Sequence, residues 1–438
     1  MSTLAAESLR VPAHSQRTRS EGWIENRTAL ILFGAGLLIG CYQAFRPGFG
    51  FGRGNEMVSI ARNLAATGIY GNPFPPAVTG PTAVVPPLYP LFLGGLIKLF
   101  GLSPLFVLVA ELANVLANAW IAALMPRLSR VFYEDATPGA FAGILWLFSM
   151  RLLPQWDVSY TVLGLVLFLL LSAATIERPK RAPLWASLAG LIAGLLTLAN
   201  PATGLVSIPW VLYLAWSRRV PLQLVLRYVS VLVAVIGLCN LPWVIRNYTI
   251  WREPVLRTNF GMTIYSSNND CAQSSLFRNM ANGCYQSTHP VLSEKESQLL
   301  KDLGELSYDR KRTADTFAWI RSHPSRFRQL TVSRAIEFWF PDGLDETLYA
   351  FWLSTILFVP GLVVMARRRE PVTAFVLFIS LVYPLMYYIV VSCDRYRYPI
   401  LWASQLPAGY CAVVLIGMIR NLGTQPSVPP LTAPPVRQ

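Results

Sequence analysis

Long apolar stretches alternate with short polar segments along most of the chain. An α-helix needs about 20 mainly apolar residues to cross the hydrocarbon core of a bilayer. Stretches that approach this length predict an all-α, polytopic membrane protein. The predicted spans cover residues 28–45, 102–125, 138–152, 158–176, 184–199, 202–216, 225–245, 348–366, 371–391 and 399–419.

The polar segments define the predicted organisation of the chain. A tail precedes the first span, a long polar insert follows the seventh, and a Pro-rich, disordered tail ends the sequence. The insert is too long for a simple connection. We therefore expect a cytoplasmic tail, an N-terminal transmembrane module, a periplasmic insert, C-terminal transmembrane helices and a cytoplasmic tail, at residues 1–27, 28–245, 246–347, 348–419 and 420–438.

Basic clusters between the apolar stretches predict the topology. They lie at residues 178–181, 218–219 and 367–369, and basic residues accumulate in cytoplasmic loops. The first loop and the insert then both lie outside, so an even number of crossings separates them. The short apolar stretch at 86–101 begins with two prolines and contains Lys98. We predict that this stretch does not span, which leaves about ten transmembrane helices.

The first outer loop, residues 46–101, is rich in Gly and Pro and contains one short helical pattern at 56–66. There Met57, Ile60 and Leu64 recur at helical spacing and form an apolar face. A short helix with such a face favours the membrane interface. With the stretch at 86–101, this predicts interfacial helices in the first outer loop.

Composition supports the membrane class. Hydrophobic residues make up 53% of the 438-residue chain and charged residues only 14%, whereas soluble domains carry about a quarter charged residues. The formal net charge of +14 is concentrated in the basic clusters. The charge therefore indicates topology and does not predict a nucleic-acid partner.

Cysteine and histidine positions predict no metal site and no cofactor. The six cysteines form no CxxC pair, and His289 and His323 lack the spacing of metal ligands. A divalent cation between two outer acids is the alternative. Cys271 and Cys284 lie in one polar segment, where they form a disulfide if the segment is extracytoplasmic or remain free thiols.

The predicted outer face combines carboxylates and arginines. A guanidinium offers paired donors that suit a phosphate headgroup, and a carboxylate suits a general base that takes a proton from an acceptor hydroxyl. Together these groups describe sugar transfer from a lipid-phosphate donor by direct displacement, with inversion at the sugar carbon. The candidate residues on this face are Glu56, Asp157, Asn200, Arg246, Arg395 and Arg397.

Each candidate also has a structural interpretation. Glu56 suits a solvated interface residue, and Asp157 suits a helix N-cap. Arg395 and Arg397, next to two tyrosines, suit anchors in the headgroup region. The residue types alone leave both interpretations open.

The first outer loop and the stretch after it contain an ordered series of motifs: Asn55-Glu56, Ile60-Ala61-Arg62-Asn63-Leu64, Gly68-Ile69-Tyr70, Pro86-Pro87-Leu88-Tyr89-Pro90 and Leu99-Phe100-Gly101. This series resembles the opening of bacterial GT-C fold membrane glycosyltransferases, the relatives of protein O-mannosyltransferases and of the lipid A aminoarabinose transferase. The resemblance extends over residues 28–260, with a weaker match at Arg395-Tyr396-Arg397-Tyr398-Pro399.

The resemblance implies a polyprenyl-phosphate-linked sugar donor, an envelope acceptor and transfer at the periplasmic side of a bacterial inner membrane. It implies Glu56 as the base, with Asp157 as a second acid. The candidate substrate contacts are Arg53, Arg62, Tyr89, Asn200, Arg246, Arg395 and Arg397.

Two positions depart from the family pattern. Arg53-Gly54-Asn55 stands where the family often has Asp, and Val84-Val85 stands where many relatives have a basic residue before Pro-Pro. Either Glu56 then serves as the base, shifted by one or more positions, or the enzyme is altered or inactive. Arg246, Arg395 or Arg397 must supply the phosphate contact. The competing hypotheses are a transporter or flippase of a lipid-linked solute, which predicts internal repeats that the sequence does not show, and a non-catalytic envelope scaffold.

Overall fold

The computed structural model describes residues 19–45, 55–343 and 347–423, and α-helices dominate these ranges. No β-strand forms within them, which confirms the all-α prediction. The α-helices are α1 (Arg19–Ala44), α2 (Glu56–Thr67), α3 (Leu88–Phe100), α4 (Pro104–Tyr133), α5 (Thr137–Ser149), α6 (Val158–Glu177), α7 (Ala182–Ala199), α8 (Gly204–Ser217), α9 (Leu222–Trp251), α10 (Phe260–Ser267), α11 (Leu276–Ala281), α12 (Cys284–Thr288), α13 (Glu294–Leu303), α14 (Glu305–Ser322), α15 (Pro324–Trp339), α16 (Leu348–Arg367), α17 (Val372–Val382), α18 (Leu385–Tyr388) and α19 (Tyr398–Gly423).

Seven helices in the described part of the chain are long and apolar enough to cross a membrane, which supports the polytopic class. They are α1, α4, α6, α7, α9, α16 and α19. The other three predicted spans are the shorter helices α5, α8 and α17, with 13, 14 and 11 residues. Helix α3 also has 13 residues, which is about 20 Å at 1.5 Å per residue. Its length equals that of α5, so length alone does not separate α3 from the predicted spans, and its non-spanning placement stays a prediction.

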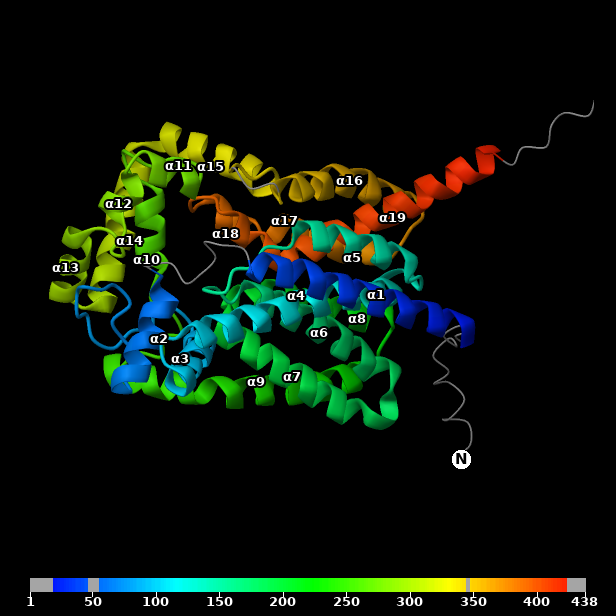
Figure 1. The fold of residues 1–438 in the computed structure, drawn as a ribbon, viewed down its shortest axis with the longest axis horizontal. Coiled ribbons are helices and arrows are strands. Elements are labelled where there is room, and N and C mark those ends of the chain that lie inside the picture. Colours follow the sequence, from blue (N-terminus) through cyan, green and yellow to red (C-terminus); the bar gives the residue numbers. More distant parts are fainter. Residues whose placement is uncertain (1–18, 46–54, 344–346, 424–438) are drawn as a thin grey trace, which may run out of the picture.

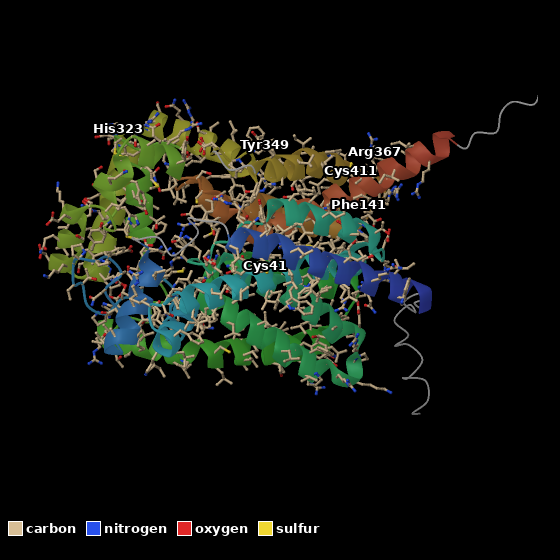
Figure 2. The ribbon with its side chains drawn as sticks, viewed as in Figure 1. Cys41, Phe141, His323, Tyr349, Arg367 and Cys411 are labelled. Carbon is tan, nitrogen blue, oxygen red and sulfur yellow. A yellow bond between two sulfur atoms is a disulfide. The ribbon has the colours of Figure 1, made fainter. Side chains whose placement is uncertain are left out.

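The first outer loop and the insert lie at the same end of the helix bundle. In Figure 1, α10 to α14 of the insert gather at the left beside α2 and α3 of the first outer loop. Figure 2 places His323 of the insert and Arg367 of a basic cluster at opposite ends of the molecule. The insert and this basic cluster therefore lie far apart along the bundle. Helix α9 continues to Trp251, past the predicted start of the insert.

Helix α19 forms the centre of the bundle. In its most apolar stretch 72% of the residues are buried, whereas none are buried in that of α9, which packs on α7 at the periphery. Glycines allow α19 to approach its neighbours closely, as small residues do in membrane helices. A Cβ at Gly409 would lie 2.1 Å from the Pro138 carbonyl oxygen of α5. A Cβ at Gly361 of α16 would lie 2.2 Å from the Pro407 carbonyl oxygen of α19.

The insert is a compact group of short helices. Its helix α10 packs on α14, where a Cβ at Gly261 would lie 1.9 Å from the Asp309 carbonyl oxygen. Cys271 and Cys284 form a disulfide, so the structure selects the paired alternative. The disulfide joins the segment after α10 to the first residue of α12.

Candidate functional site

A cavity of about 620 Å³ lies where the first outer loop, the start of α6 and the insert meet. We call it the outer cavity. Aromatic and apolar side chains line much of its wall, and a few charged groups face into it, as is typical of small-molecule sites. The lining includes Glu56, Val84, Pro86, Trp156, Asp157, Asn200, Arg257, Phe260, Met262, Tyr285, His289, Tyr387, Arg395 and Tyr396.

Glu56 is the first residue of α2 and is only 8% exposed. The Asn55 side chain caps this helix by accepting a hydrogen bond of 2.8 Å from the Met57 N–H. Asn55 Nδ2 also donates to the Gln155 carbonyl oxygen at 3.3 Å, which joins the first outer loop to the second. The helix dipole favours a carboxylate in this first turn. Glu56 is therefore a buried acid at the cavity wall and not a solvated interface residue.

Asp157 lies just before α6 on the wall of the same cavity and is also 8% exposed. Its side chain makes no N-cap hydrogen bond; instead Oδ2 accepts a hydrogen bond of 3.3 Å from Thr161 Oγ1. Burial raises the pKa of Asp157 above its ordinary value, and Arg257 and Arg395 oppose this rise. The N-cap interpretation is therefore wrong for its side chain.

Two arginines of the outer cavity face the acids. The Arg395 guanidinium carbon lies 3.6 Å from the centroid of the Trp156 ring, which is a close cation–π contact. Arg257 follows α9, and its Nε donates a hydrogen bond of 3.1 Å to the Val84 carbonyl oxygen. The Arg257 side chain is solvent-exposed and lines the cavity. Both guanidinium groups are therefore available to an anionic ligand.

Two other predicted arginines lie outside the cavity. Arg246 donates to the carbonyl oxygens of Thr82 and Tyr70, at 2.7 and 2.8 Å. Arg397 is 1% exposed and donates to the Trp339 carbonyl oxygen at 2.7 Å. Both guanidinium groups are thus committed to backbone acceptors, and neither lines the outer cavity. Buried carbonyl groups need such donors, so the structure places neither Arg246 nor Arg397 at the predicted phosphate site.

Of the remaining predicted site residues, Asn200 lines the outer cavity, whereas Tyr89 and Arg62 do not. Asn200 lines the cavity, and its side chain accepts a hydrogen bond of 3.2 Å from the Ala202 N–H. Tyr89 is buried outside the cavity, and its hydroxyl donates to the Pro154 carbonyl oxygen. Arg62 is exposed on α2 and does not line the cavity. Arg53 lies outside the described residues.

The sequence did not identify Arg257 as a site residue. It suggested His289 only as a metal ligand, and the spacing argued against that role. Arg257 lies in a short connection without periodicity, so the sequence offered no signal for its orientation. His289 was visible only as a lone histidine in the insert. In the described part of the chain, no three His, Cys, Asp or Glu side chains are grouped so that they could hold a metal ion.

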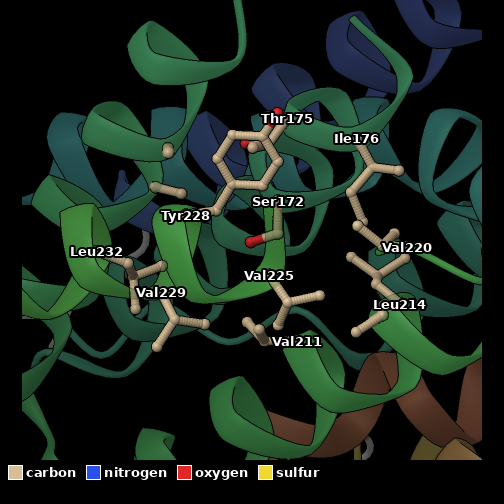
Figure 3. A pocket seen from close by; sticks show the side chains of 13 residues that line it. Ser172, Thr175, Ile176, Val211, Leu214, Val220, Val225, Tyr228, Val229 and Leu232 are labelled. Atoms are coloured by element: carbon tan, nitrogen blue, oxygen red, sulfur yellow. The ribbon is translucent and has the colours of Figure 1, made fainter. Parts of the chain in front are cut away.

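A second cavity lies between α6, α7, α8 and α9 and has a different chemistry. Its volume is about 50 Å³, and its wall is almost entirely aliphatic. Figure 3 shows Ser172, Thr175 and Tyr228 among valine, leucine and isoleucine side chains. This wall contains no charged residue. It offers neither a base nor a phosphate contact, so the outer cavity is the candidate site.

Known structures share this fold. No protein-family model and no curated protein sequence matches the chain. The crystal structure of the apo Archaeoglobus fulgidus oligosaccharyltransferase matches with a TM-score of 0.56 at 14% identity, over 92% of this chain and 52% of that chain. The same enzyme tethered to an acceptor peptide matches with a TM-score of 0.53 at 14% identity, over 92% and 51%.

ArnT from Cupriavidus metallidurans, bound to undecaprenyl phosphate, matches with a TM-score of 0.41 at 13% identity, over 89% of this chain and 78% of that chain. The present chain spans about half the length of the oligosaccharyltransferase. At these identities the match to the oligosaccharyltransferase concerns the fold alone. The chain has the GT-C fold predicted from its motifs.

Proposed function

We propose that this protein is a membrane glycosyltransferase that transfers a hexose or pentose from a polyprenyl-phosphate-linked donor to an envelope acceptor. One observation carries the proposal: the outer cavity brings Glu56 and Asp157 together with Arg257 and Arg395 at one end of an apolar helix bundle. A lipid donor can reach such a site from the bilayer, and a lipid, glycan or protein acceptor can reach it from outside.

The residues divide the proposed reaction between them. Arg257 and Arg395 bind the phosphate of the donor through charge-assisted hydrogen bonds. Glu56 takes the proton of the acceptor hydroxyl as that oxygen forms a bond to the sugar carbon. The bond from this carbon to the phosphate oxygen breaks, and the phosphate leaves with the electron pair. Asp157 orients the acceptor, and the direct displacement inverts the sugar carbon.

Structural neighbours support the donor class. The archaeal oligosaccharyltransferase AglB has been solved with an inhibitory peptide and a dolichol-phosphate, and that structure matches this chain with a TM-score of 0.50 at 14% identity. A polyprenyl phosphate is therefore a ligand that this fold accommodates. We propose the same class of ligand here, bound by Arg257 and Arg395.

The proposed location is a bacterial inner membrane with the outer cavity facing the periplasm. The Cys271–Cys284 disulfide supports this orientation, because disulfides persist in oxidising compartments. We further propose that transfer needs no organic cofactor. A divalent cation is the alternative, and activity after treatment with a chelator and after adding back Mg²⁺ or Mn²⁺ separates the two.

The test uses inner-membrane vesicles that contain the full chain and undecaprenyl phosphate charged with single hexoses or pentoses. Release of undecaprenyl phosphate is followed by mass spectrometry. We expect the variants Glu56→Gln and Asp157→Asn to lose release at normal protein levels. Glu294→Gln changes an exposed acid of the insert and serves as the control.

Full activity of Glu56→Gln would overturn the proposed chemistry. Movement of the intact donor across the bilayer without release of undecaprenyl phosphate would instead support the transporter hypothesis.

A further inference from the structure

A histidine of the insert contacts the proposed base. His289 Nε2 lies 3.5 Å from Glu56 Oε1, and His289 is 5% exposed. The two residues come from α2 and from the end of α12, so only the folded insert brings them together. The separation is longer than a typical hydrogen bond, and such contacts often tighten when substrate binds.

The hydrogen bonding of the ring sets which nitrogen faces Glu56. The backbone N–H of Val291 donates to His289 Nδ1 at 3.2 Å. Since Nδ1 accepts, a neutral ring carries its proton on Nε2, and this N–H is directed at the Glu56 carboxylate. The neutral tautomer is therefore the one that can hold Oε1.

Aromatic neighbours fix the plane of the ring. Tyr285 stacks on His289 with ring centroids 4.6 Å apart, and Phe74 meets it edge-on at 6.0 Å. The charged groups that act on the ring are Glu56, from α2, and Arg395, from the segment before α19. Burial lowers the pKa of His289, Glu56 raises it and Arg395 lowers it. Burial and Arg395 thus favour the neutral ring.

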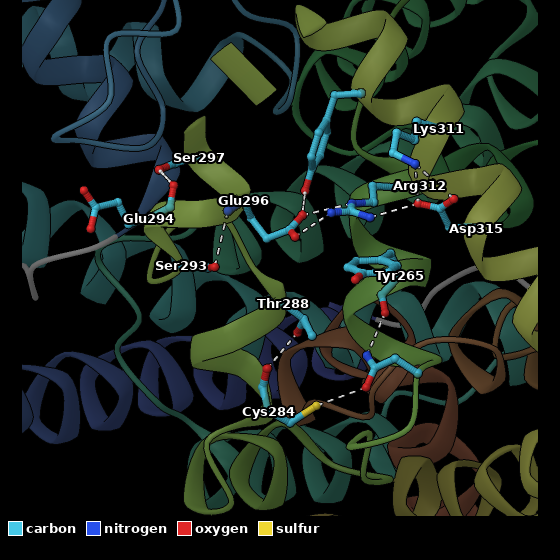
Figure 4. A network of polar contacts seen from close by, with 12 residues as sticks. Tyr265, Cys284, Thr288, Ser293, Glu294, Glu296, Ser297, Lys311, Arg312 and Asp315 are labelled. Atoms are coloured by element: carbon cyan, nitrogen blue, oxygen red, sulfur yellow. Dashed lines mark hydrogen bonds and ion pairs between the residues drawn. The ribbon is translucent and has the colours of Figure 1, made fainter. Parts of the chain in front are cut away.

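The insert holds α12 in place through several contacts. Cys284, the first residue of α12, is tied by the disulfide, and its carbonyl oxygen accepts a hydrogen bond of 2.8 Å from Thr288 Oγ1. Figure 4 shows these residues below a second network, in which Arg312 of α14 binds Glu296 of α13. Arg312 Nε donates to Glu296 Oε2 at 2.9 Å. These contacts fix α12 on one side of His289 and join α13 to α14 on the other side.

We propose that His289 is a positioning residue for the Glu56 carboxylate, and that the insert thereby completes the active site. Its Nε2–H holds Oε1, which leaves Oε2 to take the proton of the acceptor hydroxyl. The inference rests on the proposed function for its catalytic meaning, whereas the contact itself can be measured without any assay of transfer.

The first measurement is a histidine titration by NMR on the full chain in lipid nanodiscs. The chain has only three histidines, at positions 14, 289 and 323, so ¹³C-labelled histidine gives few signals. The variant His289→Gln identifies the signal of His289. Removing an opposite charge near an ionisable group shifts its pKa by about one unit or more, so Glu56→Gln should lower the pKa of His289. The signal of His323, which directly follows the last residue of α14, should not change.

Transfer kinetics give the second measurement. Small displacements of a catalytic group cost about tenfold to a hundredfold in rate, so we expect a fall of that size in kcat for His289→Ala with little change in the KM for the donor. His289→Gln, whose amide can also donate, should keep most of the activity, and His323→Gln is the matched control. A purely structural role would predict parallel losses in both His289 variants.

The two hypotheses fail in different ways. If His289 titrates identically in the wild type and in Glu56→Gln, the contact is absent and the inference is overturned. If Glu56→Gln lowers the pKa of His289 but remains fully active, the proposed function fails while the contact stands. If Glu56→Gln is inactive but His289→Ala is fully active, the positioning role alone is overturned.

Discussion

Glu305 of α14 accepts a hydrogen bond of 2.7 Å from the backbone N–H of Ala83, so the insert holds the first outer loop directly. The hydroxyls of Thr82 and Thr258 donate to the same carboxylate. Burial nevertheless raises the pKa of Glu305 from 4.5 to about 6, against these hydrogen bonds and Arg246. This one carboxylate connects loop and insert beside the outer cavity.

The raised pKa predicts a pH-dependent stability. Between pH 4.5 and about 6 the folded protein binds the proton of Glu305 more tightly than the unfolded chain does. The contribution of Glu305 to stability is therefore largest below pH 4.5 and falls by about 2 kcal/mol as the pH rises through this window. Glu305→Gln should remove this dependence, measured as Tm against pH. The exposed Glu294→Gln should keep it, and an unchanged profile in Glu305→Gln would contradict the assignment.

Arg257 is expected to bind the donor phosphate. Hydrogen bonds to charged groups contribute about 1.5–3 kcal/mol, so Arg257→Gln should weaken binding of undecaprenyl phosphate at least about tenfold. Native mass spectrometry of the full chain in detergent measures the bound fraction. Arg62→Gln alters an exposed arginine outside the cavity and should bind normally. Equal affinities of the two variants would remove Arg257 from the phosphate site.

The disulfide is expected to stabilise the insert. Its cysteines are separated by 13 positions, and closing a loop of this size contributes about 3 kcal/mol. The double variant Cys271→Ser with Cys284→Ser should make the insert more sensitive to limited proteolysis. Cys41→Ser, at a free thiol of α1, is the control. Identical cleavage rates would show that the other contacts of the insert suffice.

Close packing around α19 predicts a contrast between two glycines of one helix. Gly409→Ala places a methyl group against the Pro138 backbone and should destabilise the bundle by about 1–3 kcal/mol. Gly417→Ala meets nothing within 4 Å and should be neutral or slightly stabilising, since alanine favours the helix. Thermal unfolding in the same detergent compares them. A loss of stability in both variants would point to a cause other than packing.

The sequence by itself determined the helical membrane class, and the seven described helices that are long enough to cross a membrane all coincide with predicted spans. These features follow from hydropathy and charge, which are properties of each segment and of its position relative to the bilayer. The motif order also indicated the fold, and the acids Glu56 and Asp157 both line the outer cavity. Span lengths followed less directly, because α5 and α17 end earlier than their apolar patterns do and α8 begins later than its pattern.

Only the tertiary structure decided which polar side chains share the cavity. Arg246 and Arg397 looked like phosphate contacts, but nearby backbone carbonyl groups occupy their donors, while Arg257 is directed into the cavity. The contact of His289 with Glu56 joins residues from separate segments of the chain. Side-chain orientation depends on hydrogen bonds and packing between distant segments, and hydropathy along one segment carries no information about such contacts.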